Sequence, residues 1–329
     1  MKGSKQIRWA ALSAWTLAGV VLTAAPRVHA SDSGKDERTC NIAVLAYSKG
    51  RATESCDLRA IKAVAHSGVV FEQNQMGIAS VLGIAGGRDA KGALKWFQDA
   101  ARRGYAPAQV NLAAMYSNGW GTDRNYGATL YWLRKAADQN YAPAYYDLGR
   151  LYLKGSGVRR DYEEALRLFR KAAEGGDTWA ETNVGYMYDQ GLGVAQDRTE
   201  AATWYRKAAG EGNALAQNNL ADLYLKGEGV AQSDASAFQW FQKAAEQGQS
   251  GACIKLGYMY ANGRGTVRDF QVAYTWTLAG VEAGDERGRD YLAGLESQLS
   301  PSQLAHAREQ ARKLNVGAHA STASMAFLQ

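Results

Sequence analysis

The sequence predicts an all-α protein, a right-handed α–α superhelical solenoid built from 36-residue helix–turn–helix repeats. The first observation is an alanine that recurs every 36 residues from Ala108 to Ala252, without any insertion. The second is a tyrosine column with the same interval, from Tyr116 to Tyr260. A third column holds Trp96, Trp132, Leu168, Trp204, Trp240 and Trp276. A fixed period in the range of about 20 to 50 residues is typical of stacked supersecondary units that bury one continuous core.

One unit, residues 144–179, shows how the pattern predicts two helices. Apolar residues from Ala144 to Tyr152 fall at i, i+4, i+7 and i+8, which places them on one stripe of a first helix. Gly155 and Gly157 then predict a turn, because glycine adopts positive φ without steric cost. A further column admits only small residues, as expected where a second helix crosses closely: Gly77, Ala113, Gly149, Gly185, Ala221 and Gly257.

The start of each second helix is marked by a column of short polar residues. Its members are Asp89, Asn125, Asp161, Asp197, Ser233 and Asp269. All six are residue types whose side chains accept hydrogen bonds from the first free N–H groups of a helix. Asp161 with Glu164, and Asp197 with Glu200, have capping-box spacing. The column therefore indicates structural N-caps rather than catalytic acids.

The two ends of the array are expected to be capped. Residues 72–287 form six repeats, of which the first is atypical, and a half-repeat with a capping helix should occupy 288–314. Ser300-Pro301-Ser302-Gln303 supplies an N-cap, a proline at the first helical position and a capping-box glutamine, so we expect a helix over 301–314. Residues 315–329 lack any period and are interpreted as a mobile tail, with a docking motif as the alternative.

The N-terminal segment 1–30 predicts a signal peptide. A basic start precedes a short apolar run, and Val28-His29-Ala30 has the small-x-small pattern of a cleavage site; the alternative is an uncleaved membrane anchor. The whole chain has a formal charge of +6, and loss of the four basic residues in this segment would leave +2. A basic surface for nucleic acid therefore loses its support. We expect a periplasmic or secreted protein without an integral membrane segment after cleavage.

Cysteine usage agrees with an oxidising compartment. Cys40 and Cys56 lie in residues 31–71, which we interpret as a disordered start and a helical N-terminal cap. In an exported protein these two cysteines are expected to pair. Cys253 lies in the last full repeat and is expected to be a small buried residue.

The repeat pattern resembles the Sel-one-like repeat (SLR) family, which is related to tetratricopeptide repeats. The segment ALAQNNLADLYLKGEGV, from Ala214 to Val230, is close to the family consensus, and the resemblance covers about residues 72 to 299. It implies an adaptor for protein partners, often in bacterial envelope assembly, exopolysaccharide regulation or host contact. Cysteine-rich relatives linked to penicillin binding suggest the alternative, a cell-wall or β-lactam-directed enzyme. Their helix-bridging cysteine pairs are missing here.

A set of non-core positions on the first helices is the candidate partner-binding groove. With the recurring alanine as position 1, positions 4, 7 and 11 lie off the core stripe, and first helices usually line the concave side of a solenoid. The candidate residues are Asn111, Asp147, Arg150, Asn183, Tyr186, Asn219, Asp222, Lys255 and Tyr258. Their mixed polarity with two tyrosines favours a protein or peptide partner, and a solvated helix face is the alternative. The asparagines should bond partner backbone, while Arg150 and Lys255 should meet carboxylates.

No catalytic or cofactor motif is found in the sequence. The histidines after the predicted cleavage site, His66, His306 and His319, do not have the spacing of a metal site or a triad. A nucleophile elbow, a phosphate-binding loop and a C-x-x-C pair are absent from the sequence. We therefore expect a protein that is not an enzyme and that uses no metal or cofactor, while its oligomeric state stays open.

Overall fold

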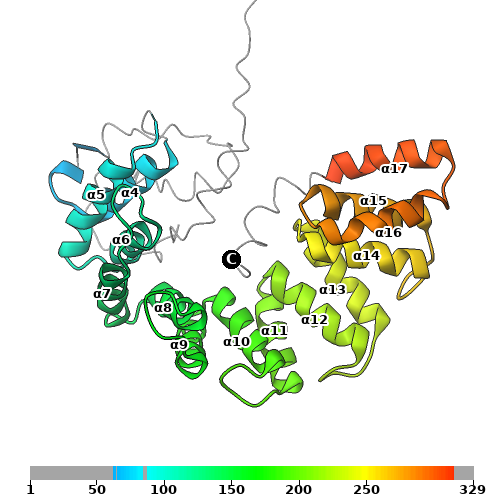
Figure 1. Cartoon of the computed structure of the whole chain (residues 1–329), viewed down its shortest axis with the longest axis horizontal. Coiled ribbons are helices and arrows are strands. Elements are labelled where there is room, and N and C mark those ends of the chain that lie inside the picture. Colours follow the sequence, from blue (N-terminus) through cyan, green and yellow to red (C-terminus); the bar gives the residue numbers. More distant parts are fainter. Residues whose placement is uncertain (1–61, 64, 84–86, 315–329) are drawn as a thin grey trace, which may run out of the picture. The chain divides into compact units, whose positions relative to one another are not determined.

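The structure is a computed structural model that describes residues 62–63, 65–83 and 87–314. Within these ranges it contains fourteen α-helices and no β-strand, which confirms the all-helical solenoid of repeats. The chain divides into two units, one ending at Arg160 and one beginning at Asp161, and each is described by itself. Within each unit, consecutive helices of the repeats contact each other (Figure 1).

Each repeat contributes a first and a second helix. The first helices are α4 (Val70–Leu82), α6 (Ala106–Asn118), α8 (Ala142–Lys154), α10 (Thr178–Gln190), α12 (Ala214–Lys226) and α14 (Ser250–Asn262). The second helices are α5 (Ala90–Arg102), α7 (Tyr126–Ala137), α9 (Tyr162–Glu174), α11 (Arg198–Gly210), α13 (Asp234–Glu246) and α15 (Phe270–Glu282). A short 3₁₀ helix η2 (Glu286–Gly288), α16 (Arg289–Glu296) and α17 (Pro301–Leu314) follow.

The predicted cap residues set the helix boundaries. All six members of the N-cap column accept a hydrogen bond from a backbone N–H in the first turn of the second helix, as in Asp89 from Gly92 N at 2.8 Å and Ser233 from Ser236 N at 3.2 Å. Each first helix ends at a glycine with φ between +66° and +76°. These caps satisfy backbone groups that a helix end leaves without partners.

The two capping boxes expected at Asp161 and Asp197 are incomplete, because the glutamate side chains do not bond to the N-cap backbone. Glu164 and Glu200 have the required spacing, but neither side chain reaches back to its N-cap residue. Glu164 instead binds Arg167, whose Nε donates to Oε2 at 2.6 Å. Glu200 accepts from Trp204 Nε1 at 2.8 Å. In both cases a donor one turn further along the same helix takes the carboxylate.

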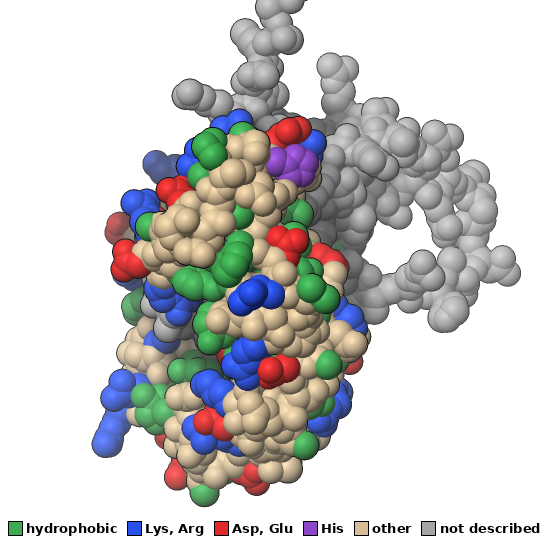
Figure 2. Space-filling model, turned by 90° about the vertical axis from the view of Figure 1, so that its right-hand side faces the viewer, with side chains coloured by type: hydrophobic (Ala, Val, Ile, Leu, Met, Phe, Trp, Pro, Cys, Tyr) green, Lys and Arg blue, Asp and Glu red, His purple; other side chains and the backbone are tan. Residues whose placement is uncertain are grey.

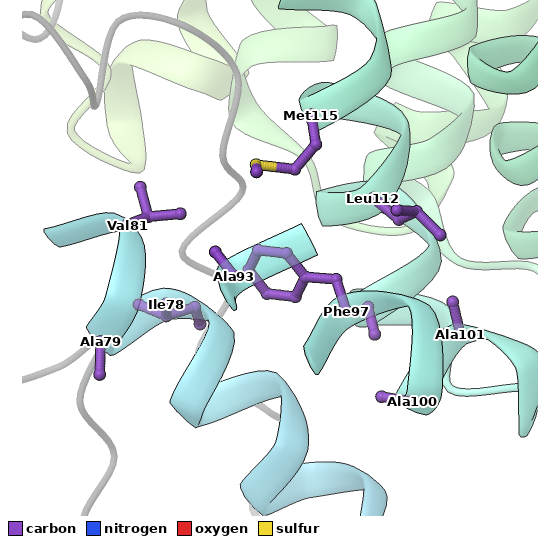
Figure 3. Close-up of a cluster of buried hydrophobic side chains, with 10 residues drawn as sticks. Ile78, Ala79, Val81, Ala93, Phe97, Ala100, Ala101, Leu112 and Met115 are labelled. Atoms are coloured by element: carbon purple, nitrogen blue, oxygen red, sulfur yellow. The ribbon is translucent and has the colours of Figure 1, made fainter. Parts of the chain in front are cut away.

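The small-residue column is explained by the second-helix side chains packed against it. A Cβ added at Gly77 would lie 2.4 Å from the Phe97 ring, and one at Gly185 would lie 2.7 Å from the Tyr205 ring. In the core of the first unit, Phe97 of α5 lies between Ile78 of α4 and Leu112 and Met115 of α6 (Figure 3). At Gly77 and Gly185 the ring leaves space for hydrogen only, whereas Ala113 and Ala221 show that a methyl group fits in other repeats.

The C-terminal end is closed by α17 packed on α15. The expected helix 301–314 is confirmed by α17, and its capping box is complete. Gln303 Oε1 accepts from Ser300 N at 2.9 Å, while Gln303 N donates to Ser300 Oγ at 3.3 Å. Side chains then join three elements, since Arg308 of α17 donates to Tyr274 of α15 and to Glu296 of α16.

Several sequence predictions concern residues outside the described ranges. They are the signal peptide over residues 1–30, the Cys40–Cys56 pair, most of the N-terminal cap and the tail over residues 315–329. Cys253 is described, and it is buried with a free thiol, as expected. None of the helices in the described ranges is long and apolar enough to cross a membrane.

Candidate partner-binding face

The predicted binding residues lie on the first helices, but the structure separates them into an internal set and an accessible set. In the first unit, Asn111 is on α6, and Asp147 and Arg150 are on α8. In the second unit the six remaining residues lie on α10, α12 and α14. We call the accessible side chains at positions 7 and 11 of these helices, together with the accessible side chains at position 4, the first-helix face. Its main members are Asp147, Arg150, Tyr186, Asp222, Lys255 and Tyr258.

Two of the predicted asparagines are internal, which corrects the role expected for them. Asn111 is fully buried, and its Nδ2 donates to Asn74 Oδ1 of α4 at 3.0 Å. Asn183 is also buried, and its Nδ2 donates to the Trp179 carbonyl at 2.8 Å. Because burying an amide requires internal hydrogen bonds, these side chains serve the fold and are not available to partner backbone.

Position 4 connects consecutive repeats. Lys255 Nζ donates to Asn218 Oδ1 at 3.2 Å, and this pair has the same sequence separation as Asn111 and Asn74. Asn219 is half-buried and accepts from the neighbouring Asn218 Nδ2 at 3.1 Å. The sequence contains a signal for this role, since both of these contacts join position 4 of one repeat to position 3 of the preceding repeat.

The charged residues of the face are already paired within the protein. In the first unit Arg150 lies 3.6 Å from Asp147 and stacks over the Tyr146 ring at 5.8 Å. In the second unit Lys255 forms an ion pair with Asp222. All four side chains keep some exposure, so these pairs contribute little to stability and can exchange for partner charges.

Tyrosines provide the accessible apolar area of the face in the second unit. Tyr258 at position 7 of α14 is 43% exposed, whereas Tyr186 of α10 is half-buried. The Tyr258 ring lies 6.1 Å from the ring of Tyr291 on α16, in a tilted arrangement. Tyr291 was not among the predicted residues, although it follows Lys255 by one repeat length and thus continues the position-4 column.

The charged and titratable side chains bear on whether the protein could hold a metal ion or a charged ligand. Acidic and basic side chains are interspersed on the surface that Figure 2 shows, without a large area of one sign. Among the residues of the described ranges, no group of His, Cys, Asp or Glu is arranged to hold a metal ion. Burial raises the pKa of Tyr205 well above its usual value, and this side chain lies in the core beneath the face rather than on it.

Comparison with known proteins identifies the repeats. The family model described as Sel1 repeat matches residues 73–105, 106–141, 142–177, 180–213, 214–249 and 250–285. The chain belongs to the Sel1 repeat family. Sel1 repeat proteins are protein-interaction scaffolds, and nothing here shows catalysis. A comparison with curated proteins found no match.

Two solved Sel1 repeat structures are similar to this chain. A Sel1 repeat protein from Oxalobacter formigenes is 31% identical, with a TM-score of 0.64 over 69% of this chain and 100% of that one. The protein c5321, a protective antigen of uropathogenic Escherichia coli strains with an SLR fold, is 27% identical, with a TM-score of 0.50 over 83% of this chain and 66% of that one. Both support the repeat architecture described above.

Proposed function

We propose that this Sel1 repeat protein is an exported scaffold that binds a partner polypeptide along the first-helix face, in envelope assembly, exopolysaccharide regulation or host contact. The observation that carries the proposal is the exposed Tyr258 ring beside Tyr291, next to the Lys255–Asp222 ion pair. A tyrosine offers a large rigid area that loses little entropy on binding, and tyrosine is enriched among residues that dominate binding energy.

Export and host contact are supported by two separate features. The N-terminal sequence has the order of a signal peptide, with a basic start, an apolar run and a small-x-small site. The similar Escherichia coli protein is described as a protective antigen, which agrees with a role at the interface with a host. No observation favours the alternative of a cell-wall or β-lactam-directed enzyme.

The test is a comparison of partner capture by three variants of the full chain. Tyr258→Ala and the double variant Tyr186→Ala, Tyr258→Ala remove accessible rings from the face. Tyr131→Ala is the matched control, because Tyr131 is 53% exposed but lies on the second helix α7. Partners crosslinked from envelope extract would be quantified by mass spectrometry, and circular dichroism would verify that each variant keeps its helicity.

The expected result is selective loss of capture. An anchor at an interface is worth about 2 kcal/mol or more, which corresponds to roughly 30-fold weaker binding. The double variant should show at least this loss, while Tyr131→Ala should capture the same partners as the unmodified protein. Equal capture by the unmodified protein and the double variant would show that the partner binds elsewhere.

A further inference from the structure

In two of the repeats, a glutamine at position 2 forms the same set of hydrogen bonds, which includes one to the preceding second helix. Gln109 is buried, and its Nε2 donates to the Ala101 carbonyl of the preceding second helix at 3.2 Å. Its Oε1 in turn accepts from Gln139 Nε2 at 2.9 Å. The same arrangement recurs three repeats later: Gln217 donates to Ala209 O at 3.1 Å and accepts from Gln247 at 2.8 Å.

The α10–α11 repeat has two carboxyl groups where these repeats have two glutamines. Glu181 occupies position 2 and is 0% exposed, and Glu211 follows it at the same spacing that separates Gln217 from Gln247. The equivalent carbonyl is that of Ala173, which accepts from Gly176 N at 3.0 Å, just as Ala209 O accepts from Gly212 N at 3.1 Å. An ionised carboxylate only accepts hydrogen bonds, so it cannot replace the glutamine donor.

The charges around Glu181 partly offset one another. Lys207 Nζ of α11 lies 2.7 Å from Glu181 Oε1 and forms an ion pair with it, but neither carboxylate oxygen has a partner in hydrogen-bond geometry. Glu211 and the N-cap Asp177 add negative charge. On the other side, α9 carries Lys171 and Glu174 in its last turn. Burial is the largest influence and raises the pKa of Glu181, although Lys207 acts in the opposite direction.

We propose that the contact between α10 and the preceding helix α9 depends on pH. Glu181 takes up a proton from solvent, and its carboxylic acid then donates a hydrogen bond to the Ala173 carbonyl. The protonated side chain then reproduces the donor that Gln109 and Gln217 supply in their own repeats. When the proton is lost, the buried Glu181 carboxylate lies near the negative charge of Glu211, and the Ala173 carbonyl has no side-chain donor. The inference concerns repeat stability and stands independently of the proposed partner face.

The direction of the pH effect follows from the raised pKa. A group whose folded-state pKa is raised stabilises the fold below its unfolded pKa, for which the ordinary glutamate value is 4.5, and this contribution is lost as pH rises through the folded-state pKa. In that window each proton held only by the folded repeat changes the opening equilibrium by about tenfold per pH unit. We therefore expect α10 and α11 to open more readily at pH 8 than at pH 5.

Hydrogen exchange of the full chain tests this expectation repeat by repeat. After correction for the intrinsic pH dependence of exchange, peptides from α10 and α11 should lose protection between pH 5 and pH 8. Glu181→Gln supplies the side chain found at Gln109 and Gln217 and should reduce this loss. The N-cap Asp177 of α10, whose pKa burial also raises, accounts for the part that remains. Glu163→Gln is the matched control, since Glu163 is exposed in the first turn of α9 and should leave the loss unchanged.

A transplant makes the test independent of how well Glu181→Gln folds. The variant Gln217→Glu, Gln247→Glu copies the carboxyl pair into the next repeat, where Lys243 is equivalent to Lys207. The pH-dependent loss should then also appear in α12 and α13. An identical pH response of Glu181→Gln and the unmodified chain, or a transplant without any pH response, would overturn the proposal.

Discussion

In three turns of the second unit, the second glycine lies against the backbone of the preceding second helix; these glycines are Gly193, Gly229 and Gly265. At Gly229, with φ +70°, an added Cβ would lie 2.2 Å from the Arg198 carbonyl carbon and oxygen. At Gly265 the corresponding distance, to Asp234 O, is 2.4 Å. In the sequence these glycines were explained by the positive φ of a turn, but the structure adds a close approach to a residue about one repeat earlier. Their recurrence along the chain thus has two physical causes.

A pair of alanine substitutions separates these two causes. Gly212 also has positive φ, +94°, but no atom lies within 4 Å of an added Cβ. Gly212→Ala should therefore cost only the left-handed conformation, about 1 to 2 kcal/mol. Gly229→Ala should cost about 1 to 3 kcal/mol more, because the backbone must also move. Urea denaturation measures both, and equal losses would show that the turn relaxes freely.

Tyr205 is a buried tyrosine in a column otherwise made of Phe97, Leu133, Phe169, Phe241 and Thr277. Its hydroxyl has no hydrogen-bond partner in the structure. A buried hydroxyl without a partner is destabilising, so Tyr205→Phe should leave the free energy of unfolding unchanged or raise it by up to about 2 kcal/mol. Thermal denaturation provides the measurement. A clear loss of stability would show that the hydroxyl is hydrogen-bonded in solution, with Asn219 as the candidate partner.

At the scale of helices, caps were predictable and contacts between repeats were not. N-caps, C-cap glycines and the bounds of α17 depend on residues within a few positions, so the sequence alone identified them. The Glu164 and Glu200 side chains were misassigned because Arg167 and Trp204 compete for them. Asn111 and Asn183 were taken as accessible because the helical pattern of one repeat does not show what a neighbouring repeat or turn covers.

The C-terminal helix α17 is held by a network that should respond to acid. Tyr274 of α15 donates to Glu296 Oε1 at 2.7 Å, and Arg308 of α17 donates to both Tyr274 and Glu296 at 3.2 and 2.9 Å. These bonds, first that from Tyr274, lower the pKa of Glu296. A lowered folded-state pKa gives stability that is present above the unfolded pKa and lost as pH falls through the folded pKa.

Tyr274→Phe tests this network at the end of the array. Because Glu296 is partly exposed and can regain water, the substitution should cost about 1 kcal/mol at neutral pH. The difference from the unmodified chain should shrink in acid, where Glu296 is protonated in both proteins. Denaturation curves at pH 7 and pH 3 give the comparison. A penalty that stays constant between these pH values would assign the loss to packing instead.

For the whole molecule, a constant period predicts which helices form but not what the array binds. The repeats share the positions of their core residues, N-caps and turn glycines, so several copies predict these features at once. Binding depends on positions that differ from copy to copy, such as Arg150, Tyr186 and Tyr258 at position 7. The proposed export likewise depends on the N-terminal segment 1–30 rather than on the repeats. That segment and Cys40 and Cys56 therefore need a measurement of their own.

Thiol labelling and intact mass together test the proposed compartment. We propose that the exported protein begins at Ser31 and contains a Cys40–Cys56 disulfide. Cys253 is 0% exposed, and burial raises the pKa of its thiol to about 12, so it should resist alkylation while the protein is folded. Native protein from the periplasm or medium should therefore take up no label, whereas reductant alone should expose two cysteines and denaturant alone should expose one. Labelling of Cys40 or Cys56 in native, unreduced protein, or an intact mass that includes residues 1–30, would contradict the proposal.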